Sequence, residues 1–201
     1  MDREQFFADF NNGLHRIGRT AMVLMIGALL AVPEQMGTIL EQKEYIQYLA
    51  YQHFHNDDIF FIGRNVDYAL SLEGSLKLKE ISYIHSEAYA AGELKHGTIS
   101  LVEDGTLVIA IASCRRLTEK TLSNAMEVRA RGAQVLALAA ESVKEEVSHV
   151  ADQVITIPDT HDVLLPSLAI LPLQLFAYYV ALYRGCDIDK PRNLAKSVTV
   201  E

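Results

Sequence analysis

Cysteine, tryptophan and basic residues are scarce in this sequence. Its 201 residues include no tryptophan and only two cysteines, Cys114 and Cys186. Two distant thiols, with no cysteine or histidine at metal-ligand spacing around them, exclude a disulfide scaffold and suit a reducing cytoplasm. The 18 basic residues are outnumbered by 26 acidic ones, which gives a formal charge of −8. Because an acidic chain repels a phosphate backbone, we expect no nucleic-acid partner.

Glycine and proline are also sparse, with 11 and 5 residues, whereas half of the chain is apolar. This composition excludes a disordered chain and a fibrous one. The length is sufficient for one domain with a sizeable core and an additional helical arm.

Long apolar runs are limited to two. Thr20–Val32 is uncharged, but its thirteen residues are too few to span a bilayer. Acidic residues near the start of the chain, and Leu29 at the −3 position of the best cleavage site, argue against a signal peptide. Val163–Tyr183 is long enough to span, yet its prolines and polar residues favour a buried helix that closes an α/β layer. We therefore expect no membrane partner, and a membrane-attached form is the weaker alternative.

The first 56 residues have helical periodicity and are predicted to form an arm. The spacing predicts a helix from Phe6 to about Leu30, and Pro33 is expected to interrupt it. A second helix should follow from about Glu34 to His53. The polar cluster at 55–58 predicts a turn, so we place the main domain at 57–186 and a polar tail at 187–201.

Within the main domain, short apolar runs alternate with helical stretches. The predicted strands are Ile59–Ile62, Thr106–Ala112, Gln134–Ala139 and Gln153–Ile157. The predicted helices are Tyr68–Ile84, Thr118–Arg131, Ser142–Val150 and Leu165–Arg184. Continuously apolar strands are typical of a parallel sheet that is covered on both faces. The sequence therefore predicts an α/β fold, a doubly wound parallel sheet in a three-layer α/β/α arrangement.

Phosphate-binding motifs are weak or missing at the expected strand ends. The chain has no G-x-G-x-x-G or Walker sequence, and Gly63 with the two residues after it is a weak anion signal. Arg115 and Arg116, after the second predicted strand, could meet an anion, but a helix capped by Thr118, with the two arginines exposed, is the favoured interpretation.

The helix predicted from Tyr68 carries an acid–base pattern. Glu73 and Lys77 are four residues apart and Lys77 and Glu80 three apart, so all three share one face. Spacing alone favours a solvated ion-pair ladder. The alternative is a carboxylate held beside an ammonium to move a proton near neutral pH.

Two polar segments complete the set of candidates. The stretch from His85 to Thr98 fits neither a clean strand nor a clean helix, and His96 in it could transfer a proton. The C-terminal segment contains Lys196, which could form a Schiff base with a carbonyl if the tail is docked.

The segments Leu72–Gly97 and Pro191–Glu201, supported by Val128–Gly132 and 172–175, closely resemble the glutamine–fructose-6-phosphate aminotransferase family. That family has a glutaminase domain followed by two sugar isomerase (SIS) domains. The similarity covers residues from about Asp58 to the end and is weak before Pro33. It implies that this chain is the second SIS domain, preceded by a helical connector.

The resemblance also implies roles for individual residues. Glu80 matches the general base that moves a proton between C1 and C2 of the sugar, and Lys77 matches the lysine beside it. His96 matches the histidine that opens the fructose ring and that reaches a neighbouring subunit's site. Lys196 matches the lysine that forms a Schiff base with the keto sugar, and Ala195 a backbone contact to substrate. No metal or organic cofactor is implied.

Departures from the family pattern limit what we expect of this chain alone. Asp2 stands where the family has its catalytic cysteine, and Thr98 stands where many members have proline. The Ser/Thr-rich loop that holds the sugar phosphate belongs to the first SIS domain. We therefore expect a homodimer that binds fructose 6-phosphate or glucosamine 6-phosphate with little synthase activity. The alternative is a stand-alone SIS module that senses a phosphosugar and regulates another process.

Overall fold

A computed structural model describes residues 3–192, and of residues 3–17 and 19 it describes the backbone only. The α-helices are α1 (Arg3–Leu40), α2 (Lys43–His53), α3 (Val66–Ser82), α4 (Thr118–Arg129), α5 (Lys144–Ser148) and α6 (Leu165–Tyr183). The strands are β1 (Asp58–Gly63), β2 (His85–Ala90), β3 (Leu107–Ala112), β4 (Gln134–Ala140) and β5 (Gln153–Ile157). Short 3₁₀ turns occupy Leu94–His96, Thr98–Leu101, Arg115–Leu117 and Glu141–Val143.

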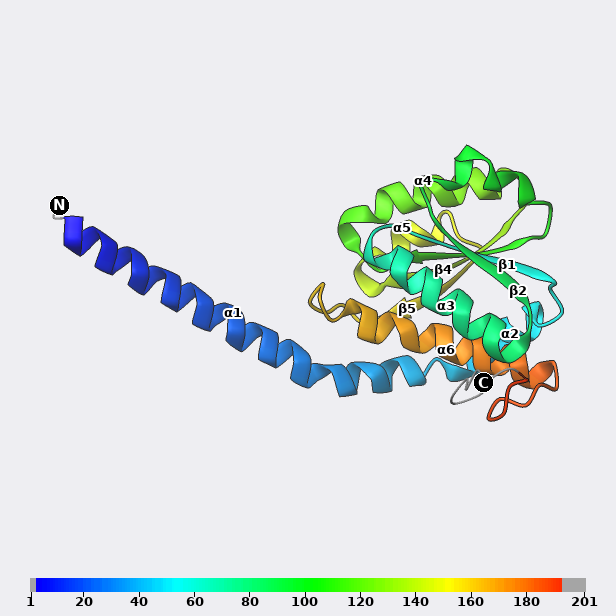
Figure 1. Cartoon of the computed structure of the whole chain (residues 1–201), viewed down its shortest axis with the longest axis horizontal. Coiled ribbons are helices and arrows are strands. Elements are labelled where there is room, and N and C mark those ends of the chain that lie inside the picture. Colours follow the sequence, from blue (N-terminus) through cyan, green and yellow to red (C-terminus); the bar gives the residue numbers. More distant parts are fainter. Residues whose placement is uncertain (1–2, 193–201) are drawn as a thin grey trace, which may run out of the picture.

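The five strands form one parallel sheet in the order β2-β1-β3-β4-β5. The order reverses between β1 and β3, so the chain winds outward in both directions from that point. Helices lie on both sides of the sheet, and the first part of α1 extends away from the rest of the molecule (Figure 1). This architecture confirms the predicted doubly wound α/β fold preceded by a helical arm.

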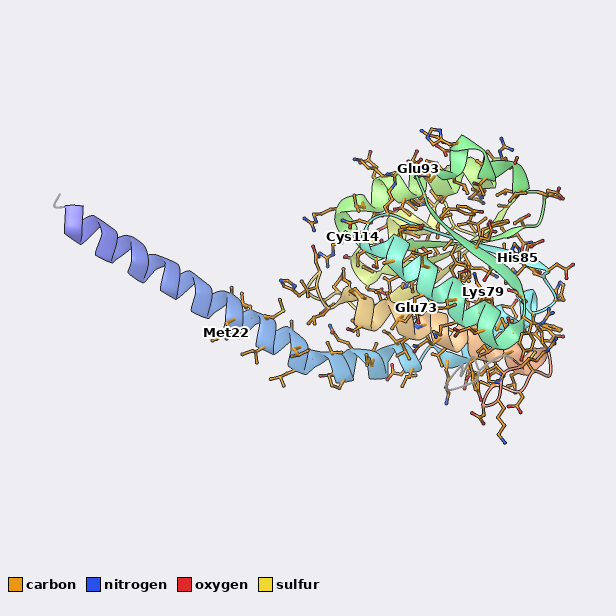
Figure 2. All side chains as sticks on the ribbon, in the orientation of Figure 1. Met22, Glu73, Lys79, His85, Glu93 and Cys114 are labelled. Atoms are coloured by element: carbon orange, nitrogen blue, oxygen red, sulfur yellow. The ribbon has the colours of Figure 1, made fainter. Side chains whose placement is uncertain are left out.

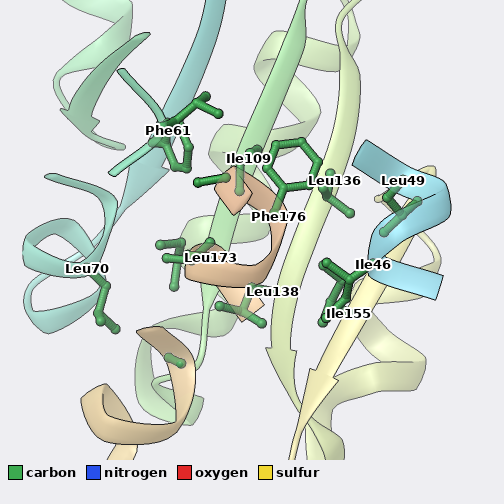
Figure 3. Close-up of a cluster of buried hydrophobic side chains, with 14 of the residues drawn as sticks. Ile46, Leu49, Phe61, Leu70, Ile109, Leu136, Leu138, Ile155, Leu173 and Phe176 are labelled. Carbon is green, nitrogen blue, oxygen red and sulfur yellow. The ribbon is translucent and has the colours of Figure 1, made fainter. Parts of the chain in front are cut away.

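Side-chain alternation along the strands builds two cores. Ile59 and Phe61 of β1 point to the face covered by α2, α3 and α6, where Figure 3 shows Leu173 and Phe176 packed over the strands. Phe60 and Ile62 point to the opposite face, which α4 and α5 cover. Because both faces of the sheet are buried, its inner strands require apolar residues at every position. This requirement explains why the sequence pattern located β1, β3 and β4 correctly; β5 was also located, although it is an edge strand, because its sequence is largely apolar.

Pro33 does not end the first helix, contrary to the sequence-based prediction. Helix α1 continues through it to Leu40, and the break falls at 41–42 instead. A proline inside a helix has no N–H to donate to the carbonyl oxygen four residues earlier, and here that carbonyl belongs to Leu29. Leu29 is exposed, so water can satisfy that carbonyl and the helix bends rather than stops (Figure 1).

The stretch after His85 contains a strand that the sequence analysis did not predict. β2 pairs with β1 in parallel along its whole length, from Asp58 opposite His85 to Gly63 opposite Ala90. As an edge strand, β2 is covered less completely than the inner strands, so its composition can be polar. Ser86 is buried at a position where a strand usually carries an apolar residue, and hydrogen bonds with Ser75 of α3 satisfy its hydroxyl. The segment therefore lacks the apolar pattern from which a strand is predicted.

Helix α5 is shorter than the predicted Ser142–Val150, because a 3₁₀ turn takes Glu141–Val143 and the α-helix proper covers Lys144–Ser148. Only Val147 of α5 is buried. A single apolar anchor is enough to hold one helical turn against β4 and β5 but not a longer helix.

Two described helical segments have the length and composition to cross a membrane: Thr20–Leu40 and Leu165–Tyr183. Helix α6 is a core helix, since Leu168, Phe176 and Val180 are buried against the sheet. The other segment is longer than the predicted thirteen apolar residues, because α1 runs past Pro33. Its side chains are largely exposed, and Figure 2 shows Met22 far from the sheet.

Candidate functional site

The Lys77–Glu80 pair lies on the second half of α3. The Lys77 ammonium is 2.9 Å from one Glu80 carboxylate oxygen and 3.5 Å from one Glu73 oxygen. These contacts follow from helix geometry, since residues three and four apart share a face. The predicted grouping of the three side chains is therefore present, with Lys77 donating the shorter hydrogen bond to Glu80.

Both members of the pair keep contact with solvent, with side chains 34% and 33% exposed for Lys77 and Glu80. The hydrogen bond to Glu80 raises the pKa of Lys77, so the ammonium stays charged at neutral pH. Leu72 and Leu76, on adjoining turns of the same helix, are also exposed. The surface around the pair thus combines a fixed positive charge, a carboxylate and apolar contact area.

His96 lies at the opposite end of the sheet from Glu80. Helix α3 starts after the carboxyl end of β1 and runs back, so Glu80 comes close to the amino ends of β1 and β2. His96 follows the carboxyl end of β2, in an exposed 3₁₀ turn. Figure 2 shows the same separation, with His85 at one end of β2 and Glu93 beyond the other. One copy of the chain therefore does not bring His96 to Glu80.

The other two predicted site residues, Ala195 and Lys196, lie outside the described residues, which end at Arg192.

The point where the strand order reverses contains a polar cluster that the sequence analysis missed. Asp67, in the first turn of α3, is fully buried and accepts hydrogen bonds from Ser113 Oγ at 2.5 Å and from the Cys114 backbone N–H at 3.2 Å. Burial raises the pKa of Asp67 to about 6, although the hydrogen bonds from Ser113 and Cys114 lower it. The cluster ties α3 to the loop after β3. In the sequence, the cluster is marked by an aspartate four residues after the first strand, at the start of the following helix.

Arg64 directly follows the carboxyl end of β1, close to this cluster in the sequence. Its guanidinium donates to Asn124 Oδ1 at 3.1 and 2.7 Å and lies over Gly92, where a Cβ atom would be 3.0 Å from it. Asn65 next to it has a φ of 55°, a conformation that asparagine tolerates better than most residues. These contacts lie at the carboxyl end of β1, where the strand order reverses and where a doubly wound fold usually holds a ligand.

Arg115 and Arg116 are each paired with an aspartate of the segment after β5. Arg115 is 2.5 Å from Asp159 and Arg116 is 2.9 Å from Asp162. Partial burial would raise the pKa of Asp159, but hydrogen bonds from Arg115 and Ser142 outweigh it, and the pKa is lowered. Both arginine side chains are largely exposed, in agreement with the favoured interpretation, and their ion pairs connect the loop after β3 to the segment after β5. The predicted helix cap is wrong, because Leu117 holds the cap position of α4 and the Thr118 hydroxyl donates to the Cys114 carbonyl oxygen instead.

A polar pocket of about 660 Å³ opens near the amino ends of β4 and β5. Its wall includes the Arg129–Asp152 ion pair and the buried His53, whose ring lies 3.4 Å from the Gln153 side-chain oxygen. Desolvation lowers the pKa of His53, which keeps its ring neutral. Within residues 18 and 20–192, no three His, Cys, Asp or Glu side chains are grouped as a metal site would require.

The comparisons with known proteins agree with this architecture. The SIS domain family model matches residues 54–184. The glutamine–fructose-6-phosphate aminotransferase (isomerizing) of Caldanaerobacter subterraneus is 57% identical over 182 residues, which are 90% of this chain and 30% of that protein. The enzyme of the same name from Clostridium acetobutylicum is 53% identical over 173 residues, 86% of this chain and 28% of that protein.

Among solved structures, the C-terminal domain of glucosamine-fructose-6-phosphate aminotransferase from Francisella tularensis superimposes with a TM-score of 0.77 at 37% identity. The match covers 81% of this chain and 45% of that one. The chain spans about 30% of the length of the curated relatives it matches. By fold, by family model and by sequence identity, the chain belongs to the SIS domain family and is similar to the C-terminal part of glutamine–fructose-6-phosphate aminotransferases.

Proposed function

We propose that this chain is the isomerase domain of a glutamine–fructose-6-phosphate aminotransferase and supplies part of a site that converts fructose 6-phosphate to glucosamine 6-phosphate. The observation that carries the proposal is the Lys77–Glu80 pair, held at 2.9 Å and open to solvent in a chain 57% identical to such an enzyme. We assign residues 1–56 to a connector, 57–186 to the SIS domain and 187–201 to a functional tail. The two free thiols, Cys114 and Cys186, fit a cytoplasmic location.

Ketose–aldose isomerisation moves a proton between C1 and C2 of the open-chain sugar. Glu80 is the proposed base for this transfer, because its carboxylate is accessible and its charge is balanced by Lys77. Lys77 stays protonated and stabilises negative charge that develops as the C1 proton is transferred.

Lys196 is proposed to activate the keto carbon, C2. Its amine adds to C2 and water leaves; ammonia from the family's glutaminase domain then displaces the lysine amine, and the C2=N bond that remains draws electrons from C1 when the proton departs. Ala195, next to it, is proposed to hold the sugar through its backbone.

His96 is proposed to protonate the ring oxygen during ring opening. Because it lies at the other end of the sheet from Glu80, it must serve the site of a second copy, so we propose a homodimer. The exposed Leu72 and Leu76 beside the Lys77–Glu80 pair are consistent with a surface that another domain covers.

The first experiment is calorimetric titration of the chain with fructose 6-phosphate and glucose 6-phosphate, beside Lys196→Ala. Affinity better than mM that the variant loses would show that this chain recognises the sugar without further domains, and would favour the stand-alone phosphosugar sensor. Absence of binding is expected if the phosphate loop lies in a separate domain.

The enzymatic role itself is tested by replacing the corresponding part of the Caldanaerobacter subterraneus enzyme with this chain. We expect the chimaera to form glucosamine 6-phosphate, and Glu80→Gln or Lys196→Ala in it to reduce the rate by about 100-fold or more. Glu73→Gln is the matched control, since it removes a neighbouring carboxylate from the same helix. An active chimaera that tolerates Glu80→Gln would contradict the assigned base.

A further inference from the structure

Strand β5 lies at one edge of the sheet. Among residues 3–192 it pairs with β4 alone, so one side of Gln153–Ile157 has no neighbouring strand. Such an edge presents backbone N–H and C=O groups to which a strand from another chain can add. The sequence of β5, Gln-Val-Ile-Thr-Ile, carries no charge and no proline and is mostly β-branched, which is the composition that favours strand addition.

The side chain of Gln42 occupies part of this edge. Gln42 lies in the break between α1 and α2. Its Nε2 donates to the Thr156 carbonyl oxygen at 2.8 Å, and its Oε1 accepts from the Thr156 backbone N–H at 3.4 Å. A carboxamide has the same donor and acceptor as a peptide group. Gln42 therefore makes the two hydrogen bonds that a residue of an added antiparallel strand would make opposite Thr156.

Contacts on both sides of Thr156 align the helices with the strand. Gln52 Oε1 accepts from Gln153 Nε2 at 2.6 Å, and Gln35 Nε2 donates to the Asp159 carbonyl oxygen at 2.9 Å. Because residues 35, 42 and 52 meet residues 159, 156 and 153, the helices run antiparallel to β5. Pro158, directly after the strand, has no backbone N–H to offer to a further strand. The edge is thus contacted at its start, at Thr156 and just beyond its end.

The break between α1 and α2 places Gln42 beside β5. Gln42 holds the cap position of α2, where a side chain commonly accepts a hydrogen bond from the first turn of its own helix. Its side chain makes no such bond, and its carboxamide bonds to Thr156 instead. The contact with the strand therefore takes the place of a local helix cap.

We propose that the outer edge of β5 is a self-association site, which Gln42 keeps closed by occupying the place of an added strand. The partner that fits the open edge is β5 of a second copy, because two uncharged β-branched strands can pair antiparallel without opposing like charges. This edge is separate from the Lys77–Glu80 pair and from the exposed side of α1. A copy that uses it in addition to a dimer interface has two self-complementary faces, so the assembly grows beyond a dimer.

Hydrogen exchange of the full chain tests the closure of the edge. In Gln42→Ala the Thr156 backbone N–H loses its acceptor, so it should exchange about 10-fold faster or more, as measured by NMR. Gln47→Ala is the matched control, because Gln47 is a glutamine of α2 that donates to the Tyr183 hydroxyl rather than to β5. It should leave the exchange of Thr156 unchanged. The same exchange rate in Gln42→Ala and the unmodified chain would overturn the closure.

Light scattering after size exclusion tests the self-association. At equal concentration, Gln42→Ala should give a larger mass than the unmodified chain, whereas Gln47→Ala should not. Gln42→Glu also loses the donor to Thr156, but it places a charge at the edge, and charges at sheet edges oppose strand addition. Thr156 should therefore exchange faster in Gln42→Glu without a rise in mass. Faster exchange in Gln42→Ala at an unchanged mass would overturn the proposal.

A second substitution separates pairing through β5 from aggregation of a destabilised chain. Thr156 is half-buried, so a lysine there can reach solvent while its charge opposes strand pairing. Thr156→Lys, added to Gln42→Ala, should return the mass to that of the unmodified chain. Larger assemblies that persist in the double variant would mean that another surface joins the copies, and would overturn the assignment to β5.

Discussion

Asp67 makes the stability of this domain depend on pH. A carboxyl whose pKa is 3.8 in the unfolded chain and about 6 when folded favours the native state in its protonated form. The stabilisation is complete below pH 3.8 and is lost as the pH rises through about 6. At ~1.4 kcal/mol per pKa unit, the loss amounts to about 3 kcal/mol.

We therefore expect Asp67→Asn to remove most of this loss when the free energy of unfolding is measured by urea denaturation from pH 4 to pH 7. Asp57→Asn, in the exposed turn before β1, is the control and should follow the unmodified chain. Parallel curves for Asp67→Asn and the unmodified chain would contradict the assignment.

The Lys77 ammonium reports directly on the proposed catalytic pair. Its pKa is raised, chiefly by the hydrogen bond to Glu80 and less by Glu73. In Glu80→Gln the pKa of Lys77 should fall toward its ordinary value, and in Glu73→Gln it should fall less, because that oxygen is 3.5 Å rather than 2.9 Å away. NMR titration of the lysine side chain measures both shifts. The reverse order would mean that Lys77 pairs mainly with Glu73 in solution.

At the scale of elements, the turn from β1 into α3 depends on Gly63. A Cβ atom there would lie 2.3 Å from the Asp67 carbonyl oxygen, which is backbone and cannot turn away. Gly63→Ala should therefore reduce the free energy of unfolding by about 3 kcal/mol. Thermal or urea unfolding measures the loss.

Gly37 of α1 offers the matched control, since nothing lies within 4 Å of the Cβ position there. Gly37→Ala should stabilise the chain by about 0.5–1 kcal/mol through helix propensity. Equal effects of the two substitutions would show that the turn can relax, and that Gly63 is not required for the close packing of α3 on β1.

At the scale of the whole molecule, the exposed side of α1 should drive association. Met22, Ile26, Leu29 and Leu30 are at least 48% exposed and share one side of the helix. Light scattering after size exclusion should give about twice the chain mass of 22.4 kDa. Replacing Ile26 and Leu29 by glutamine should shift the mass toward 22.4 kDa. A single-chain mass for the unmodified protein, or sedimentation with lipid vesicles, would contradict a homodimer.

Much of the fold could be predicted from the sequence because the inner strands are buried on both faces. A continuous apolar run such as that of β3, Leu107–Ala112, predicts a buried strand from composition alone. β2 could not be found in this way, since its buried Ser86 is satisfied by Ser75, a residue 11 positions away that only the fold brings near. The prediction that Pro33 ends the first helix was wrong for a similar reason, because the effect of a proline depends on whether the carbonyl oxygen that loses its donor is open to water.

The candidate site likewise contains some contacts that the sequence predicts and others that only the folded chain creates. The Lys77–Glu80 pair was predictable from a spacing of three residues, because helix periodicity alone places those side chains together. That His96 lies at the far end of the sheet from Glu80 depends on the strand order and on the direction in which α3 runs. The contact of Gln42 with Thr156, 114 residues apart, likewise required the closed fold. Local spacing determines contacts within one element, whereas contacts between elements exist only once the sheet and its helices have packed.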